Sequence, residues 1–269
     1  MPEIAARLKR AAEHVQSLGY YPAYIALYGS QNYGLVIEAE GHVSDYDFKC
    51  VVLPSLRELV DEKDEASLTI DFEGGQIDIK DIRLFSRLIE KMNPAYLECL
   101  MTEHYLVLLG GEHVESMRSI LPTLFAEQGA LFARVCAKLF EEKAKRMCHN
   151  SPAQAESIAR YGYDLKQVHH MYRLLVTLRV FEQTGRMQLV PPESEKALLL
   201  ALKRGTYHFD EILKWTEDWR TEIELIETRI AAVYGREKKS AAKRLEVLRK
   251  AAVYEHCRRE VLNDGGVQI

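Results

Sequence analysis

The feature that most constrains the fold is a glycine–serine turn followed by a pair of aspartates, each joined to an apolar run. Gly29-Ser30 ends the run Tyr24–Tyr28, and Asp45 and Asp47 stand just before the run Phe48–Leu53. Both runs are short and rich in β-prone residues, so they predict two core strands. Because alternate side chains of a strand face the same way, the two carboxylates are expected on one side, close enough to share a divalent cation.

This pairing has a chemical consequence. Two carboxylates that lie so close repel each other unless a cation or a proton lies between them. Hard cations such as Mg²⁺ (or Mn²⁺) prefer oxygen ligands and bind nucleotide phosphates as well. The turn at Gly29 and Ser30 supplies backbone N–H groups and a hydroxyl, which suit a phosphate. The pattern therefore predicts a metal site with Asp45 and Asp47 as ligands and Gly29 and Ser30 as nucleotide-binding residues.

Composition sets wider bounds. The chain has 269 residues, 47% apolar and 28% charged, enough for two modest domains or one large one. A net charge of −4 gives no indication of nucleic-acid binding, and five scattered cysteines without a C-x-x-C pair predict neither a disulfide framework nor a zinc site. The sequence shows no signal peptide and no apolar run near the ~18 residues of a membrane span. A cytoplasmic protein with no membrane partner is expected.

Periodicity predicts two halves of different character. In the first half, helical periods at 3–18 and from Ile82 to about Met92 alternate with strand patterns, which are found at 24–28, 48–53, 67–72 and 76–79. From about residue 115 the strand signals end, and helical periods follow at 117–148, 153–184, 193–203, 208–233 and 236–262. We therefore predict an α+β fold: a mixed sheet with helices in domain 1–114, then an all-helical domain 115–269 that completes the nucleotide cleft.

The pattern of Gly29-Ser30 followed by Asp45-Tyr46-Asp47 resembles the nucleotidyltransferase superfamily that includes DNA polymerase beta. This resemblance implies a third carboxylate on a strand beside the aspartate pair. Asp78 lies between Ile77 and Ile79 and so faces away from their side. It is the preferred third metal ligand and catalytic carboxylate, whereas Asp81 is expected to be a helix N-cap. Gln76 shares the face of Asp78, and a small error in register would change the assignment.

The helical half contains one cationic stripe. Lys166, His170 and Arg173 are spaced i, i+4 and i+7, so a helix presents them on one face. Point charges and a planar guanidinium suit a triphosphate, and we predict that these three residues bind the nucleotide. A solvated basic face, or a buried histidine beside Asp164, is the alternative.

Four stretches together resemble the RNA-repair-associated branch of the nucleotidyltransferases in the DNA polymerase beta superfamily. They are Gly29-Ser30-x-x-Tyr33-Gly34, Ser44-Asp45-Tyr46-Asp47, Asp81-Ile82-Arg83-Leu84-Phe85 with Asn93-Pro94-Ala95-Tyr96-Leu97-Glu98, and Tyr163-Asp164-x-Lys166-x-x-x-His170-x-x-Arg173-Leu174-Leu175. The match extends from residue 24 to about residue 230. In that branch a carboxylate often lies near the position of Gln76, so the resemblance leaves the third ligand open between residues 76, 78 and 81. Glu98 is expected to tie down the adjoining loop by hydrogen bonding.

The resemblance implies a metal-dependent enzyme that moves a nucleoside monophosphate from an NTP, such as ATP, to a hydroxyl and releases pyrophosphate. Asp45, Asp47 and Asp78 would hold two cations. The acceptor stays open among an RNA 3′ end, a protein side chain and a small molecule, and neither the preferred NTP nor the oligomeric state is predicted. A non-catalytic nucleotide-binding or sensor module on the same fold is the alternative function.

Overall fold

The computed structural model describes residues 2–39, 42–43, 45–149, 154–234 and 239–264. The chain forms two compact units. The first unit comprises Met1–Leu124 and Lys239–Ile269, and the second comprises Phe125–Lys238. Each unit is described by itself below.

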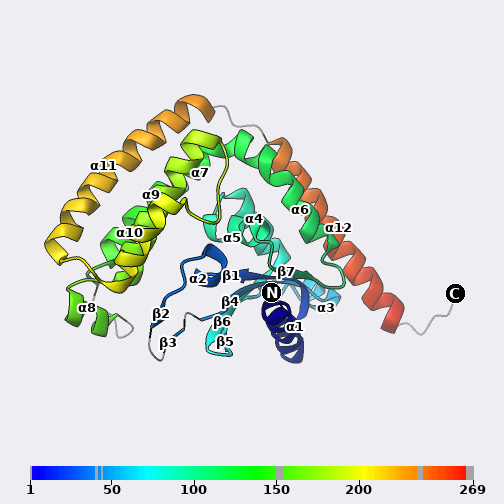
Figure 1. The fold of residues 1–269 in the computed structure, drawn as a ribbon. Coiled ribbons are helices and arrows are strands. Elements are labelled where there is room, and N and C mark those ends of the chain that lie inside the picture. Colours follow the sequence, from blue (N-terminus) through cyan, green and yellow to red (C-terminus); the bar gives the residue numbers. More distant parts are fainter. Residues whose placement is uncertain (1, 40–41, 44, 150–153, 235–238, 265–269) are drawn as a thin grey trace. The chain divides into compact units, whose positions relative to one another are not determined.

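The first unit is built on a mixed five-stranded sheet with the strand order β5-β6-β4-β1-β7 (Figure 1). Its strands are β1 (Tyr21–Tyr28), β4 (Asp47–Leu53), β5 (Ser67–Phe72), β6 (Gly75–Asp81) and β7 (Tyr105–Val107). β4 pairs with β6 in parallel, whereas the pairs β1–β4, β1–β7 and β5–β6 are antiparallel. A separate two-stranded ribbon pairs β2 (Glu38–Ala39) with β3 (His42–Val43). The predicted mixed sheet is confirmed, and β7 is a strand that the sequence pattern did not indicate.

The two faces of the sheet differ sharply. One face is apolar, and α1 (Pro2–Ser17) lies against it (Figure 1). Leu8 and Val15 of α1 share one buried cluster with Phe48 and Ile77 of the sheet. Because side chains alternate along a strand, the residues between these core positions face the other way. That opposite face carries Asp47 and the other polar side chains of β4 and β6. The alternation in the sequence thus separates an apolar core face from a face that carries the charged side chains of β4 and β6.

Several helices complete the first unit. They are α2 (Ser30–Tyr33), α3 (Leu56–Val60), α4 (Ile82–Glu90), α5 (Pro94–Met101), α6 (Glu112–Met117), the 3₁₀ turn η1 (Arg118–Ile120) and α12 (Ser240–Asp264). The last of these returns from the far end of the sequence and packs along α6 and α4. Its buried Ala241, Leu245 and Ala252 explain this docking. The units therefore differ from the predicted domains 1–114 and 115–269, because α12 belongs with the sheet.

The second unit is helical throughout its described part, as predicted for this region. α7 (Leu121–Arg146) enters from the first unit, and α8 (Ala155–Tyr161), α9 (Leu165–Thr184), α10 (Glu193–Arg204) and α11 (Phe209–Tyr234) follow. α10 and α11 both pack on α9, which buries Val168, Leu175 and Phe181. Along the described ranges, every helix is too short or too polar to cross a membrane.

Candidate active site

The turn after β1 brings its backbone against the aspartate strand. Gly29 has φ of +81° and ψ of −161°, a conformation that is almost confined to glycine. A Cβ at this position would lie 3.0 Å from Oδ2 of Asp47. The absence of a side chain at Gly29 therefore lets the Asp47 carboxylate lie directly beside the turn that Ser30 continues.

Hydrogen bonds to α5 fix the position of the turn. The hydroxyl of Tyr33 donates to Oε2 of Glu98 at 2.6 Å, and Glu98 is only 1% exposed. One turn further along α5, Thr102 Oγ1 donates to Oδ1 of Asn32 at 2.6 Å. The hydrogen-bonding role expected for Glu98 is confirmed, and these buried contacts fix α2 to α5.

The two predicted metal ligands lie at the start of β4. Asp45 is exposed and precedes the strand, and Asp47 is its first residue. Oδ1 of Asp47 accepts a hydrogen bond from the backbone N–H of Gln76 at 3.1 Å. The Asp47 carboxylate is thus positioned by β6 on one side and by Gly29 on the other. Oxygen ligands of this kind fit a hard divalent cation.

Asp78 has a different set of partners from the predicted one. Its Oδ2 accepts from Nζ of Lys49 at 2.7 Å and from the hydroxyl of Tyr96 at 3.0 Å, and its Oδ1 accepts from Nζ of Lys80 at 2.5 Å. The Lys49 ammonium also lies 4.3 Å from the ring centroids of Tyr28 and Tyr96. We call Lys49, Asp78, Lys80 and Tyr96 the Asp78 cluster.

The charges of this cluster stabilise one another. Burial raises the pKa of Asp78, but Lys49 and Lys80 outweigh it, so the pKa of this carboxyl is lowered and it is ionised at neutral pH. Burial likewise lowers the pKa of Lys49, but Tyr28 and Asp78 raise it above its ordinary value. Within the described ranges, no group of three or more His, Cys, Asp or Glu side chains is placed to hold a metal ion. The assignment of Asp45, Asp47 and Asp78 as three metal ligands stays a prediction.

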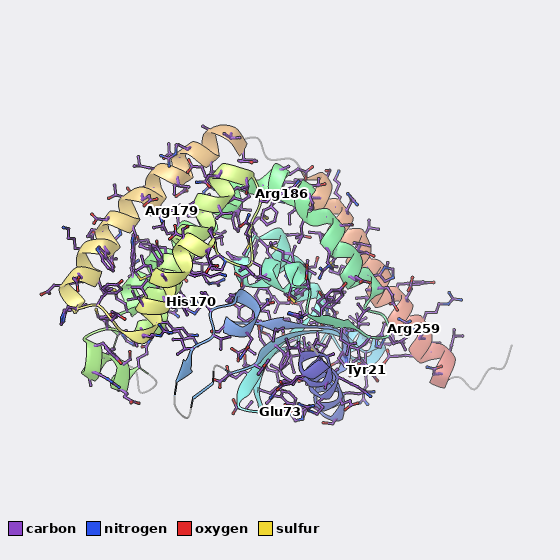
Figure 2. The ribbon with its side chains drawn as sticks, viewed as in Figure 1. Tyr21, Glu73, His170, Arg179, Arg186 and Arg259 are labelled. Carbon is purple, nitrogen blue, oxygen red and sulfur yellow. The ribbon has the colours of Figure 1, made fainter. Side chains whose placement is uncertain are left out.

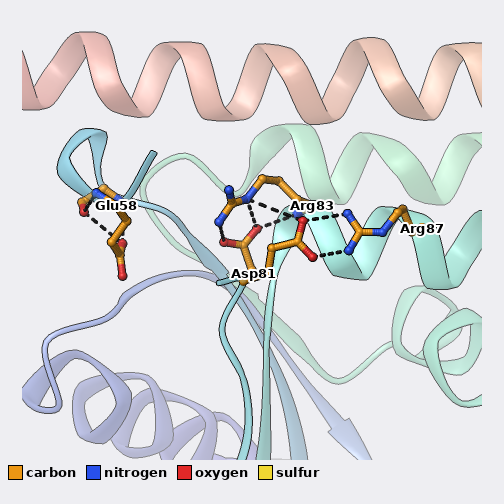
Figure 3. A network of polar contacts seen from close by, with 6 residues as sticks. Glu58, Asp81, Arg83 and Arg87 are labelled. Carbon is orange, nitrogen blue, oxygen red and sulfur yellow. Dashed lines mark hydrogen bonds and ion pairs between the residues drawn. The ribbon is translucent and has the colours of Figure 1, made fainter. Parts of the chain in front are cut away.

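The predicted role of Asp81 is confirmed. Its Oδ1 accepts from the backbone N–H of Arg83 at 2.7 Å, which caps the N-terminus of α4. Figure 3 shows that the same carboxylate also receives the Arg83 guanidinium, while the neighbouring Arg87 pairs with Glu65. Asp81 is only 2% exposed, and both of its carboxylate oxygens accept hydrogen bonds from Arg83. Its role is therefore structural.

The cationic stripe of the second unit lies on α9, which begins after the N-cap Asp164. Lys166 is exposed, and His170 (labelled in Figure 2) and Arg173 are partly buried. Burial, together with Arg173 and other cationic neighbours, holds the pKa of His170 well below its ordinary value. At neutral pH this imidazole is neutral, so its predicted contribution to phosphate binding is a hydrogen bond rather than a charge.

Two further cations of α7 extend the stripe. Burial and then the charges of Arg146 and Lys166 lower the pKa of Lys143. Lys143 also acts on His170, which places it beside the stripe. We call Lys143, Arg146, Lys166 and Arg173 the cation cluster. Sequence reasoning missed the two α7 residues because spacing along a single helix reveals only its own face.

Comparisons with known proteins identify the family of this chain. The model of the RNA repair pathway DNA polymerase beta family matches residues 3–249. No curated protein matches the chain. Among solved structures, the chain is similar to a nucleotidyltransferase-like protein from Exiguobacterium sibiricum, with 12% identity over 97% of this chain and 92% of that one and a TM-score of 0.33. That structural likeness is too low to support an argument about the site. The match of the family model over nearly the whole sequence shows that the chain belongs to the RNA repair pathway DNA polymerase beta family.

Proposed function

We propose that this chain is a metal-dependent nucleotidyltransferase that moves a nucleoside monophosphate from an NTP to a hydroxyl acceptor and releases pyrophosphate. The observation that carries the proposal is the approach of Asp47 to Gly29, with 3.0 Å between Oδ2 and the position of a Cβ at the turn. A phosphate-binding turn and a metal-binding carboxylate are useful together only if one ligand contains both phosphate and metal, and a metal–NTP complex is such a ligand.

The roles of the residues follow from their chemistry. Asp45 and Asp47 hold Mg²⁺ or Mn²⁺, which neutralises phosphate charge and orients the reacting groups when it is bound. Gly29 and Ser30 contact the phosphates through backbone N–H groups and a hydroxyl. Gln76 and Gly29 fix the orientation of the Asp47 carboxylate through the contacts described above.

The cation cluster of the second unit is a second phosphate-binding element in this proposal. Burial and then the like charges of Arg146 and Lys166 lower the pKa of Lys143, and a bound polyphosphate would offset the repulsion among these cations. Lys166 and Arg173 supply charge, and neutral His170 supplies one N–H donor. This part is tested separately by binding inorganic tripolyphosphate without metal.

The name of the family supports an RNA 3′ hydroxyl as the first acceptor to test. A protein hydroxyl is the second, because nothing in the aspartate site itself selects between them.

The decisive experiment incubates the protein with each labelled NTP, Mg²⁺ or Mn²⁺, and pools of RNA and protein acceptors. The wild type should label one acceptor class, and Asp47→Asn should abolish labelling. Asp71→Asn is the matched control: it removes an exposed carboxylate from β5, opposite Gln76 in the sheet, and should leave transfer unchanged. A wild type that binds a non-hydrolysable NTP tightly and labels nothing would support the alternative, a nucleotide sensor.

A further inference from the structure

The register of the sheet shows which residue of β6 lies level with Asp47. β4 and β6 are parallel, and Lys49 is the partner of Asp78. Asp47, two residues earlier, receives its hydrogen bond from the backbone of Gln76, two residues before Asp78. Asp78 is therefore displaced along the strand by two residues, about 6.6 Å at roughly 3.3 Å per residue. The side chain level with Asp47 is the neutral amide of Gln76.

The carboxylate of Asp78 also forms ion pairs with two lysines. The side chains of Lys49 and Lys80 are 8% and 13% exposed, and both bind its carboxylate. A divalent cation on Asp78 would face these two ammonium groups at short range, and displacing them would leave buried charges without a counterion. The tyrosine rings above and below Lys49 further restrict its movement. The carboxylate is thus unsuited to a second metal ion.

We propose that the active site holds one divalent cation instead of two, and that the Asp78 cluster supplies fixed positive charge in place of the second. The two ammonium groups and one carboxylate of the Asp78 cluster give it a net charge of +1. The Lys49 ammonium contacts the ring of Tyr28, and Tyr28 is the strand partner of Asp47, so the cluster neighbours the strand end that carries Asp47. Preorganised cations stabilise developing phosphate charge without ligands of their own. The inference rests on the proposed function, because it concerns the same site.

The experiment counts bound Mn²⁺ by electron paramagnetic resonance in the presence of a saturating non-hydrolysable NTP. The wild type should bind one Mn²⁺ per bound nucleotide and show the spectrum of an isolated ion. Gln76→Glu places a carboxylate level with Asp47 on an exposed position, and should raise the count to two with a spin-coupled spectrum. Gln76→Ala is the matched control and should keep the count at one.

The outcomes separate this inference from the function on which it rests. Two coupled Mn²⁺ ions in the wild type would overturn the inference and leave the nucleotidyltransferase proposal intact. No Mn²⁺ in the wild type would overturn both. A folded Gln76→Glu variant, with an unchanged melting temperature, that still binds a single ion would show that Gln76 does not mark the missing ligand position, and would overturn the geometric argument.

Discussion

Two regions of this protein contain clustered cationic side chains, and the pKa of a lysine is shifted in opposite directions in the two. In the Asp78 cluster, a carboxylate stands between Lys49 and Lys80, and the pKa of Lys49 is raised. In the cation cluster, burial and then the charges of Arg146 and Lys166 lower the pKa of Lys143. The carboxylates of Glu142 and Asp164 act on Lys143 more weakly.

The difference separates buried charges that are paired within the fold from like charges that lie close to one another. Paired, buried charges stabilise each other, and removing one partner is costly. Like charges that repel one another in the free protein are stabilised when an anion binds. Mutation of the first region should therefore reduce stability as well as nucleotidyl transfer, whereas mutation of the second should mainly weaken the binding of phosphate ligands.

Lys49→Met should give the largest effect, because it leaves the buried Asp78 with one ammonium fewer. We expect the free energy of unfolding to fall by about 3–5 kcal/mol, the range for a broken buried ion pair. Chemical denaturation at neutral pH measures this loss. Since the pKa of Asp78 is lowered in the folded protein, the stabilisation is present at neutral pH and is lost as the pH falls through that lowered pKa. The difference between variant and wild type should therefore shrink on acidification, and a loss independent of pH would contradict the role of this charge pair.

Gly29→Ala should reduce nucleotidyl transfer roughly hundredfold, which is about 2.7 kcal/mol of transition-state stabilisation. The new Cβ would meet Oδ2 of Asp47 at 3.0 Å, in a backbone conformation that strongly favours glycine. Initial rates with saturating NTP measure the effect. Gly34→Ala is the control, because its Cβ would have no atom within 4 Å although its φ is also positive, at +66°. Equal losses in both variants would mean that backbone strain, and not the approach to Asp47, explains the result.

Arg173→Ala should weaken binding of tripolyphosphate or a non-hydrolysable NTP by about 1.5–3 kcal/mol, the range for a charge-assisted hydrogen bond. Arg173→Lys should recover only part of this affinity, because the planar guanidinium is lost. Calorimetric titration measures both. Affinity equal to the wild type in Arg173→Ala would show that the cation cluster is solvated surface and would remove the contrast between the two regions.

The same cluster gives a prediction for pH. A bound anion favours the charged form of Lys143, so affinity should fall as the pH rises through the lowered pKa of that residue. Lys143→Arg should make the affinity independent of pH over this range, since arginine stays charged.

Asp81→Ala should have the smallest effect, a loss of about 1 kcal/mol in stability as the cap of α4 is removed. Thermal unfolding measures it. Asp81→Asn keeps a good N-cap and loses only the charge that faces Arg83, so it should be less destabilising. Nucleotidyl transfer should be unchanged in both variants, in contrast with Asp47→Asn.

Local features were predictable because local forces produce them. The mixed sheet, the cap at Asp81 and the contact role of Glu98 follow from strand alternation, capping chemistry and a short motif. The partners of Asp78 did not follow, since the face of a residue is encoded in its own strand but the register against a neighbouring strand is not. The α7 cations were missed for the same reason, because helix packing brings Lys143 to α9.

The sequence by itself determined that one core strand ends at a glycine turn and that a second core strand begins at an aspartate pair. Both features depend on residues only a few positions apart. Only the tertiary structure decided that Gln76 lies level with Asp47 and that Lys49 and Lys80 form ion pairs with Asp78. It also decided that α12 belongs to the unit that contains the sheet. These outcomes depend on parallel pairing and helix docking between distant segments. Such contacts are selected by the packing of the whole core, and many alternative registers satisfy the same local pattern.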